Sequence, residues 1–371
     1  MTAPRLRQLN DAGISFWLDG ISRFLLGSGA LAALVKDWRV SGATTNPELF
    51  LHAVTAGPAY AEQLRGLAAR EATVEQAVWE LTAHDLRWAC DVLLPVHLAR
   101  HGTTGLVSVD IDPRLSGDSA ATVEWARRLW REIDRPNLLI RIPATDTGLA
   151  AITGCLAEGI GVNAAAVFSA ERYQQVADAH LAGLELASRA GRPLARIHSV
   201  ASFHVSPIDC AVDPLLDGIG TEAALALRGK TALAVARLAL ARHRRTYDGA
   251  AWQPHARLGA RRQRLLWTAT TVHDTVYRDT HYADGLFAPG TVSAMPEQLL
   301  WAVADHGRIQ RVQQEEATGA EAARTLDSLA RLGVPLDDVP RRLEAAAHEE
   351  ATVSRYRLLD AVTTALKKAR P

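Results

Sequence analysis

The chain of 371 residues is 48% hydrophobic and 22% charged, a composition typical of a globular protein with one large core. Its 41 basic residues balance 41 acidic ones, so no basic face is implied and we expect no nucleic-acid partner. There is no run of 18 apolar residues and no signal-peptide core near residue 1. We therefore expect no membrane partner and a cytoplasmic location.

The three cysteines, Cys90, Cys155 and Cys210, lie far apart and are odd in number. Their spacing fits neither a disulfide framework nor a metal site, which is consistent with a reducing compartment. We expect all three to be small core residues, and we expect neither a metal nor a cofactor.

Short apolar runs alternate with longer amphipathic stretches along the chain, which predicts βα units and a parallel sheet. The expected strands span residues 14–18, 40–44, 105–111, 137–142, 161–168, 196–205, 264–272 and 290–293. A first helical stretch is expected to follow the first strand and to end at residue 35. Further helical stretches are expected over residues 58–99, 120–133, 147–157 and 214–245. Eight strands in one alternating series predict an α/β fold, a single (β/α)8 TIM barrel.

The C-terminal region is predicted to be helical, with one apolar stripe that must pack against the rest of the protein. The stripe consists of Val353, Tyr356, Leu359, Val362 and Leu366. We expect residues 1–371 to form one barrel domain, with residues 310–371 as a C-terminal helical extension.

Active sites of such barrels lie at the C-terminal ends of the strands. The polar residues expected there are Asp19, Asn46, Asp110, Asp112, Arg141, Asn163, Ser202, His204, Thr270 and His273. Arg141 lies in the apolar segment NLLIRIPAT, where an unpaired charge would be strongly unfavourable. We therefore predict that Asp19 and Asp110 hold Arg141 at the barrel mouth. From these residues alone, a structural ion pair and a functional cluster both remain open.

Several blocks resemble the transaldolase family, in the family's order and at compatible spacing from about residue 14 to residue 310. They are SFWLDGISRFLLGSGALAALVKDWRVSGATTNPELF, VSVDIDPRL, RPNLLIRIPATDTGL, GVNAAAVFSAERY, IHSVASFHVSPID and TVSAMPE. The resemblance implies a barrel of the class I aldolase type. It also implies transfer of a dihydroxyacetone unit between sugar phosphates through a lysine Schiff base.

The sequence departs from the family's pattern at the position of that lysine. The family motif resembles IKIPAT, whereas this chain reads IRIPAT with Arg141. Arginine keeps its proton at physiological pH and cannot form the imine. Further departures are Asp110 for glutamate, Ala165 for the water-binding threonine, His204 for phenylalanine, Pro207 for the phosphate-binding arginine, Ala269 for serine and His273 for lysine. The residues that match the family are Asp19, Asn46, Asn163 and Ser202.

Three hypotheses of function follow. The first is an enzyme repurposed for lysine-independent chemistry on a small molecule other than a sugar phosphate, in specialised metabolism. Its reaction would be acid/base carbon–carbon bond chemistry, isomerisation, elimination or cyclisation. Its catalytic residues would be Asp19, Asp110 and Arg141, and its substrate-binding residues would be Asn46, Asn163, Ser202, His204, Thr270 and His273. The second is a non-catalytic pseudo-transaldolase that binds a metabolite or a partner protein. The third is a transaldolase of the pentose phosphate pathway. We expect a monomer or a homodimer.

Overall fold

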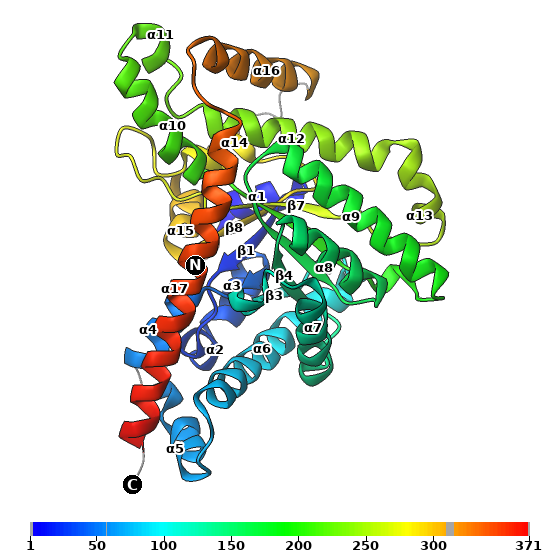
Figure 1. Cartoon of the computed structure of the whole chain (residues 1–371), viewed down its shortest axis with the longest axis vertical. Coiled ribbons are helices and arrows are strands. Elements are labelled where there is room, and N and C mark those ends of the chain that lie inside the picture. The colour runs from blue at the N-terminus through cyan, green and yellow to red at the C-terminus, as the bar shows by residue number, and fades with distance from the viewer. Residues whose placement is uncertain (1–2, 57, 309–314, 370–371) are drawn as a thin grey trace.

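A closed barrel of eight parallel strands forms the centre of the protein, and the strands follow one another around it in chain order (Figure 1). The structure is a computed structural model that describes residues 3–56, 58–308 and 315–369. The strands are β1 (Ser15–Asp19), β2 (Val40–Thr44), β3 (Leu106–Asp110), β4 (Leu138–Pro143), β5 (Val162–Val167), β6 (Ser199–His204), β7 (Arg264–Thr268) and β8 (Val292–Met295). Strand β8 pairs with β1 and closes the circle, so the predicted (β/α)8 barrel is confirmed.

Helices surround the barrel and connect its strands. They are α1 (Pro4–Asp11), α2 (Arg23–Gly27), α3 (Ala30–Trp38), α4 (Pro47–Ala56), α5 (Ala61–Ala69), α6 (Val74–Ala99), α7 (Ser119–Ile133), α8 (Asp146–Ala157), α9 (Ala170–Arg189), α10 (Ser206–Ile219), α11 (Glu222–Leu225), α12 (Thr231–Asp248), α13 (Gln253–Arg257), α14 (His281–Leu286), α15 (Glu297–His306), α16 (Glu315–Arg331) and α17 (Asp338–Ala369). None of the helices in the described ranges is both long enough and apolar enough to cross a membrane.

The lower part of the barrel interior is filled by a layer of apolar side chains. It consists of Trp17, Leu106, Leu139, Val200, Leu266, Val292 and Ala294. A Cβ atom on Gly42 would lie only 2.4 Å from the Trp17 ring, so glycine on β2 makes room for the indole. Side chains alternate inward and outward along a strand, so the next inward positions above this layer carry the polar residues of the barrel mouth.

Two predicted helical stretches are interrupted in the structure. The stretch over residues 58–99 divides into α5 and α6, because Thr73 and Gln76 form a reciprocal capping box that starts a new helix. The stretch over 214–245 divides first at Gly220, which has positive φ and caps the end of α10. It divides again in the turn between α11 and α12, where Gly229 also has positive φ.

The last helix, α17, runs along one side of the molecule past α4 and α5 (Figure 1). Its buried apolar residues in the C-terminal half are Leu358, Val362 and Leu366. The predicted stripe is wrong at Val353 and Tyr356, which are exposed. The 3.6-residue period was right, but its phase was set by the apolar surface of α5 and α6, which the helix's own sequence does not reveal.

Of the three cysteines, Cys90 and Cys155 are buried as predicted, whereas Cys210 on α10 is exposed. That residues 1–371 form one domain, with 310–371 as its extension, stays a prediction. Residues 309–314, where the extension was expected to begin, lie outside the described residues.

Candidate functional site

A cavity of about 1280 Å³ opens at the C-terminal ends of the strands. Its floor includes Asp19, Asp110, Arg141 and His204, and its outer wall includes parts of α6, α7 and α17. This is the end of a (β/α)8 barrel at which active sites are built. The cavity therefore joins these four predicted residues in one space, together with Asn46 and Asp112.

Arg141 and Asp110 form the central ion pair of this cavity. They are direct neighbours in the register of β3 and β4, and Arg141 Nη1 donates to Asp110 Oδ1 at 2.9 Å. The Thr45 hydroxyl donates to the other carboxylate oxygen of Asp110 at 2.9 Å. The carboxylate is thus held from two sides, which fixes the position of the guanidinium beside it.

His204, at the end of β6, meets Arg141 from the opposite side. Its Nε2 lies 3.3 Å from Arg141 Nη2. Because a guanidinium can only donate, His204 Nε2 must be the acceptor and the ring proton must lie on Nδ1. Burial and the charge of Arg141 lower the pKa of His204 to about 3, so the ring is neutral at physiological pH.

Asp19, at the end of β1, faces the same cavity but makes no ion pair with Arg141 within 4 Å among the described residues. The prediction that both aspartates hold Arg141 is therefore correct for Asp110 and wrong for Asp19 as a direct partner. Burial raises the pKa of Asp19, while the charge of Arg141 and a hydrogen bond from Asn46 lower it. β1 lies three strands away from β4, which carries Arg141, so Asp19 faces Arg141 across the barrel mouth and not from a neighbouring strand.

Asn46 lines the cavity and also caps a helix, as its position before Pro47 predicts. Its Oδ1 accepts a hydrogen bond from the backbone N–H of Leu49 at 3.2 Å, in the first turn of α4. The cap fixes the side chain with its amide group near Asp19.

Asn163 and Ser202 are brought together, but in the barrel interior and not in the cavity lining. Ser202 Oγ donates to Asn163 Oδ1 at 2.7 Å, and Asn163 Nδ2 donates to Ser108 Oγ at 2.9 Å. All three residues are buried. In this structure they form a hydrogen-bonded layer between the apolar layer and the ion pair above it.

Thr270 and His273 are not brought into the site. Strand β7 ends at Thr268, four residues before the predicted end, and Ala269 takes a left-handed conformation with φ of 50°. This turn directs the chain away from the barrel axis. Thr270 is buried outside the cavity lining and His273 is exposed, while Thr268 and Ala269 line the cavity instead.

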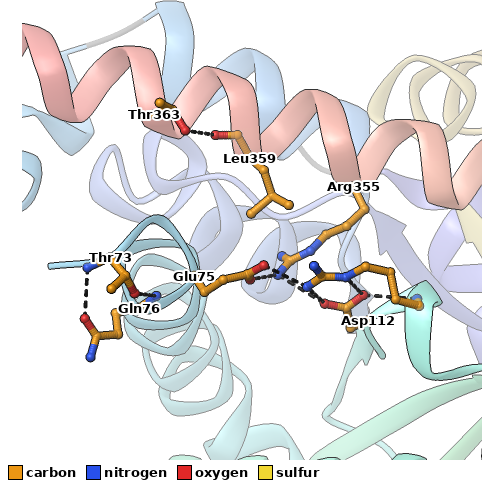
Figure 2. A network of polar contacts seen from close by, with 8 residues as sticks. Thr73, Glu75, Gln76, Asp112, Arg355, Leu359 and Thr363 are labelled. Atoms are coloured by element: carbon orange, nitrogen blue, oxygen red, sulfur yellow. Dashed lines mark hydrogen bonds and ion pairs between the residues drawn. The ribbon is translucent and has the colours of Figure 1, made fainter.

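The structure adds a contribution from α17 that the sequence patterns did not suggest. Figure 2 shows Arg355 of α17 pointing towards Glu75 of α6 and towards Asp112, which follows β3. Its Nη2 lies 2.5 Å from Glu75 Oε2 and 3.2 Å from Asp112 Oδ2, and all three residues line the cavity. Asp112 thus belongs to the rim, where it also pairs with Arg114 at 2.6 Å.

Lysine is absent from the described lining of the cavity. All four lysines of the chain are exposed: Lys36 on α3, Lys230 next to α12, and Lys367 and Lys368 on α17. The centre of the site therefore carries the guanidinium of Arg141 and not a lysine amine.

Comparison with known proteins gives the family. The model of the transaldolase/fructose-6-phosphate aldolase family matches residues 16–360. The chain belongs to this family. A transaldolase of Thermobifida fusca is 51% identical over 363 residues, which cover 97% of this chain and 98% of the relative. A transaldolase of Acidothermus cellulolyticus is 49% identical over 370 residues, covering 100% and 99%. Transaldolase 1 of Streptomyces avermitilis is 47% identical over 368 residues, covering 99% and 97%.

These relatives correct the leading hypothesis of function. Near-complete coverage at 47–51% identity to proteins named transaldolase contradicts an enzyme repurposed away from sugar phosphates for specialised metabolism. The expectation of an enzyme agrees with the family. The near-full-length identity to these relatives outweighs the departures at single positions.

Proposed function

We propose that this chain is a transaldolase that transfers a dihydroxyacetone unit between sugar phosphates. The observation that carries the proposal is the near-full-length identity to relatives named transaldolase. The cavity at the C-terminal ends of the strands supports it, because it has room for a phosphorylated sugar and presents polar groups on its floor.

Each polar group of the floor suits one part of this task. The half-buried carboxyl of Asp19 has a pKa raised by its surroundings, so it can hold a proton closer to neutral pH, as a general acid or base requires. Arg141, fixed by Asp110, offers a permanent positive charge to substrate oxygens. The Asn46 amide is placed to bind a sugar hydroxyl. Asn163 and Ser202 would support the strands that carry these groups.

In the transaldolase family, the substrate carbonyl forms an imine with a neutral lysine amine. Arg141 cannot supply this amine, so another amine must react, and borohydride reduction of the imine would identify it. Purified protein is incubated with fructose 6-phosphate and an aldose phosphate acceptor, turnover is followed, and borohydride is added to a parallel sample. The proposal expects turnover and a stoichiometric adduct, and peptide mapping then identifies the modified lysine.

The absence of lysine from the described lining of the cavity favours a second candidate, a transaldolase-family protein that binds sugar phosphates without turning them over. The Arg141→Lys variant separates the two. Fructose 6-phosphate binding without turnover in the natural chain, with an adduct at position 141 in the variant, supports the second candidate and overturns the first. A monomer or a homodimer is proposed in either case.

A further inference from the structure

A second cleft, of about 550 Å³, lies at the opposite end of the barrel from the candidate active site. It is formed around the N-terminal ends of β3, β6, β7 and β8, where Leu106, Ser199, Arg264 and Thr291 lie. The charged residues of its described lining are Arg244, Arg261, Arg262, Arg264 and Asp248. Arg262 pairs with Asp248 at 2.7 Å, so we attribute the basic character of the cleft to Arg261 and Arg264.

Arg264, the first residue of β7, brings its charge into the cleft without a carboxylate partner. Its guanidinium donates to the Ser15 hydroxyl at 2.8 Å, to the Thr291 carbonyl at 3.1 Å and to the Gly290 carbonyl at 3.4 Å. These acceptors are all neutral. Burial lowers the pKa of Arg264 to about 10, which shows that the charge is held at some free-energy cost.

Arg261 approaches the same place from the loop before β7. Its Nη2 donates to the His101 carbonyl, while Arg264 Nη1 donates to the Thr103 carbonyl 3.4 Å away on the same turn. Gly102 lies between these two residues, and a Cβ atom there would be 3.2 Å from Arg261 Nη2. Arg261 Nε also donates to the Ala195 carbonyl at 2.7 Å, so protein carbonyls hold both guanidinium groups on the wall of the same cleft.

No carboxylate of the described residues balances either group. Asp248, the acidic residue of the lining, pairs with Arg262 at 2.7 Å, and neither Arg261 nor Arg264 forms an ion pair in the described ranges. The nearby His97 and His198 rings, whose centroids lie 5.2 Å apart, add no charge to the cleft. Burial and neighbouring cations lower the pKa of both, so they are neutral. The described residues therefore supply no carboxylate that would offset the charges of Arg261 and Arg264.

We propose that this cleft binds the phosphate group of a small molecule, at a site separate from the candidate active site. Two guanidinium groups that line one cleft without a carboxylate partner in the described ranges suit a phosphate dianion, whose two charges would offset both arginines. A cleft of this size takes up a phosphorylated metabolite, not a nucleic-acid strand. This inference does not depend on the proposed transaldolase activity.

The test is calorimetric titration of the full chain with inorganic phosphate at constant ionic strength. Arg261→Gln removes one of these charges from a partly exposed position, and Arg264→Gln removes the other. Because each charge-assisted hydrogen bond to phosphate is strong, we expect either change to weaken binding at least about tenfold. Arg65→Gln, an exposed arginine on α5, is the matched control and should bind like the natural chain.

Arg141→Gln separates the two ends of the barrel, since the active-site cavity could also take phosphate. The proposal expects one phosphate site to persist in this variant, and expects that site to weaken at least about tenfold when Arg261→Gln is added to Arg141→Gln. Binding that is lost in Arg141→Gln and unchanged in Arg261→Gln would overturn the proposal, as would no saturable binding to the natural chain. If Arg264→Gln does not fold, Arg261→Gln alone decides.

Discussion

Two ion pairs of this protein consist of the same residue types, an arginine and an aspartate, but have different surroundings. In the first, Arg23 Nε lies 2.7 Å from Asp85 Oδ1, and both side chains are 8% exposed. The Tyr60 hydroxyl donates to Asp85 at 2.7 Å, and the Arg23 guanidinium lies 4.1 Å from the Tyr60 ring centroid. In the second, Arg141 and Asp110 are 17% and 31% exposed and face the cavity.

The difference shows what distinguishes a structural pair from a pair in a binding site. Arg23 and Asp85 use their polar atoms on each other, on Tyr60 and on the Leu81 carbonyl, so the pair has little left to offer a ligand even though Asp85 is among the residues that line the cavity. Arg141 is anchored on Asp110 and His204 but still lines an open space. The same two residue types therefore stabilise the fold in one place and present charge to a cavity in the other.

The largest expected effect on stability is that of Asp85→Ala. The change leaves the buried Arg23 charge unpaired and removes the acceptor of Tyr60, so the free energy of unfolding should fall by about 3–5 kcal/mol. Urea unfolding followed by circular dichroism measures this. A fall below about 1 kcal/mol would contradict the view that the pair is structural.

Arg141→Gln should show the reverse pattern. Its partner Asp110 keeps the Thr45 hydrogen bond and access to water, so we expect a stability loss of only about 1 kcal/mol. Binding of fructose 6-phosphate, measured by calorimetry, should weaken at least about tenfold because a charge-assisted contact is lost. Unchanged binding together with a large loss of stability would mean that Arg141 is a structural residue after all.

The pH dependence of stability should differ between the natural chain and His204→Gln. The lowered pKa of His204 means that the folded state excludes a proton which the unfolded chain takes up below pH 6.5. The resulting stability is present above pH 6.5 and is lost as the pH falls towards 3. The natural chain should therefore lose more stability than the variant over this window in urea unfolding at stepped pH. Parallel curves would show that His204 is not held neutral.

The smallest effect is expected at a third pair, Arg70 and Glu80, whose side chains are 56% and 37% exposed. Glu80→Ala should change the free energy of unfolding by less than about 1 kcal/mol, since exposed ion pairs contribute little. It serves as the matched control for Asp85→Ala in the same unfolding experiment. A loss comparable to that of Asp85→Ala would show that the exposed fraction of an ion pair does not determine its contribution to stability.

The sequence was sufficient to predict the barrel because strand and helix periods are local properties. Val40–Thr44 was predicted to the residue, and the other seven strands were located with shifts of a few residues at their ends. The ion pair of Arg141 and Asp110 was also predictable, because neighbouring strands of a barrel bring their last inward residues together.

What failed depended on backbone geometry or on contacts distant in sequence. Thr270 and His273 were misplaced because the left-handed turn at Ala269, a residue with no special preference for that conformation, ends β7 early. The contribution of Arg355 to the rim was missed because α17 is far from Glu75 along the chain. The relation of Asp19 to Arg141 was overstated, since sequence gives the strand order but not the distance across the barrel.

The position of α17 also has a consequence for folding during synthesis. The apolar cluster around α5 and α6 includes Tyr60, directly before α5, together with Leu67 and Leu81. It is completed only by Leu358, Val362 and Leu366 of α17. At a translation rate of about 5–20 residues per second, that first surface waits tens of seconds for its partner helix. Until then the nascent chain exposes an apolar patch beside an unfinished rim, which is the kind of surface that chaperones bind.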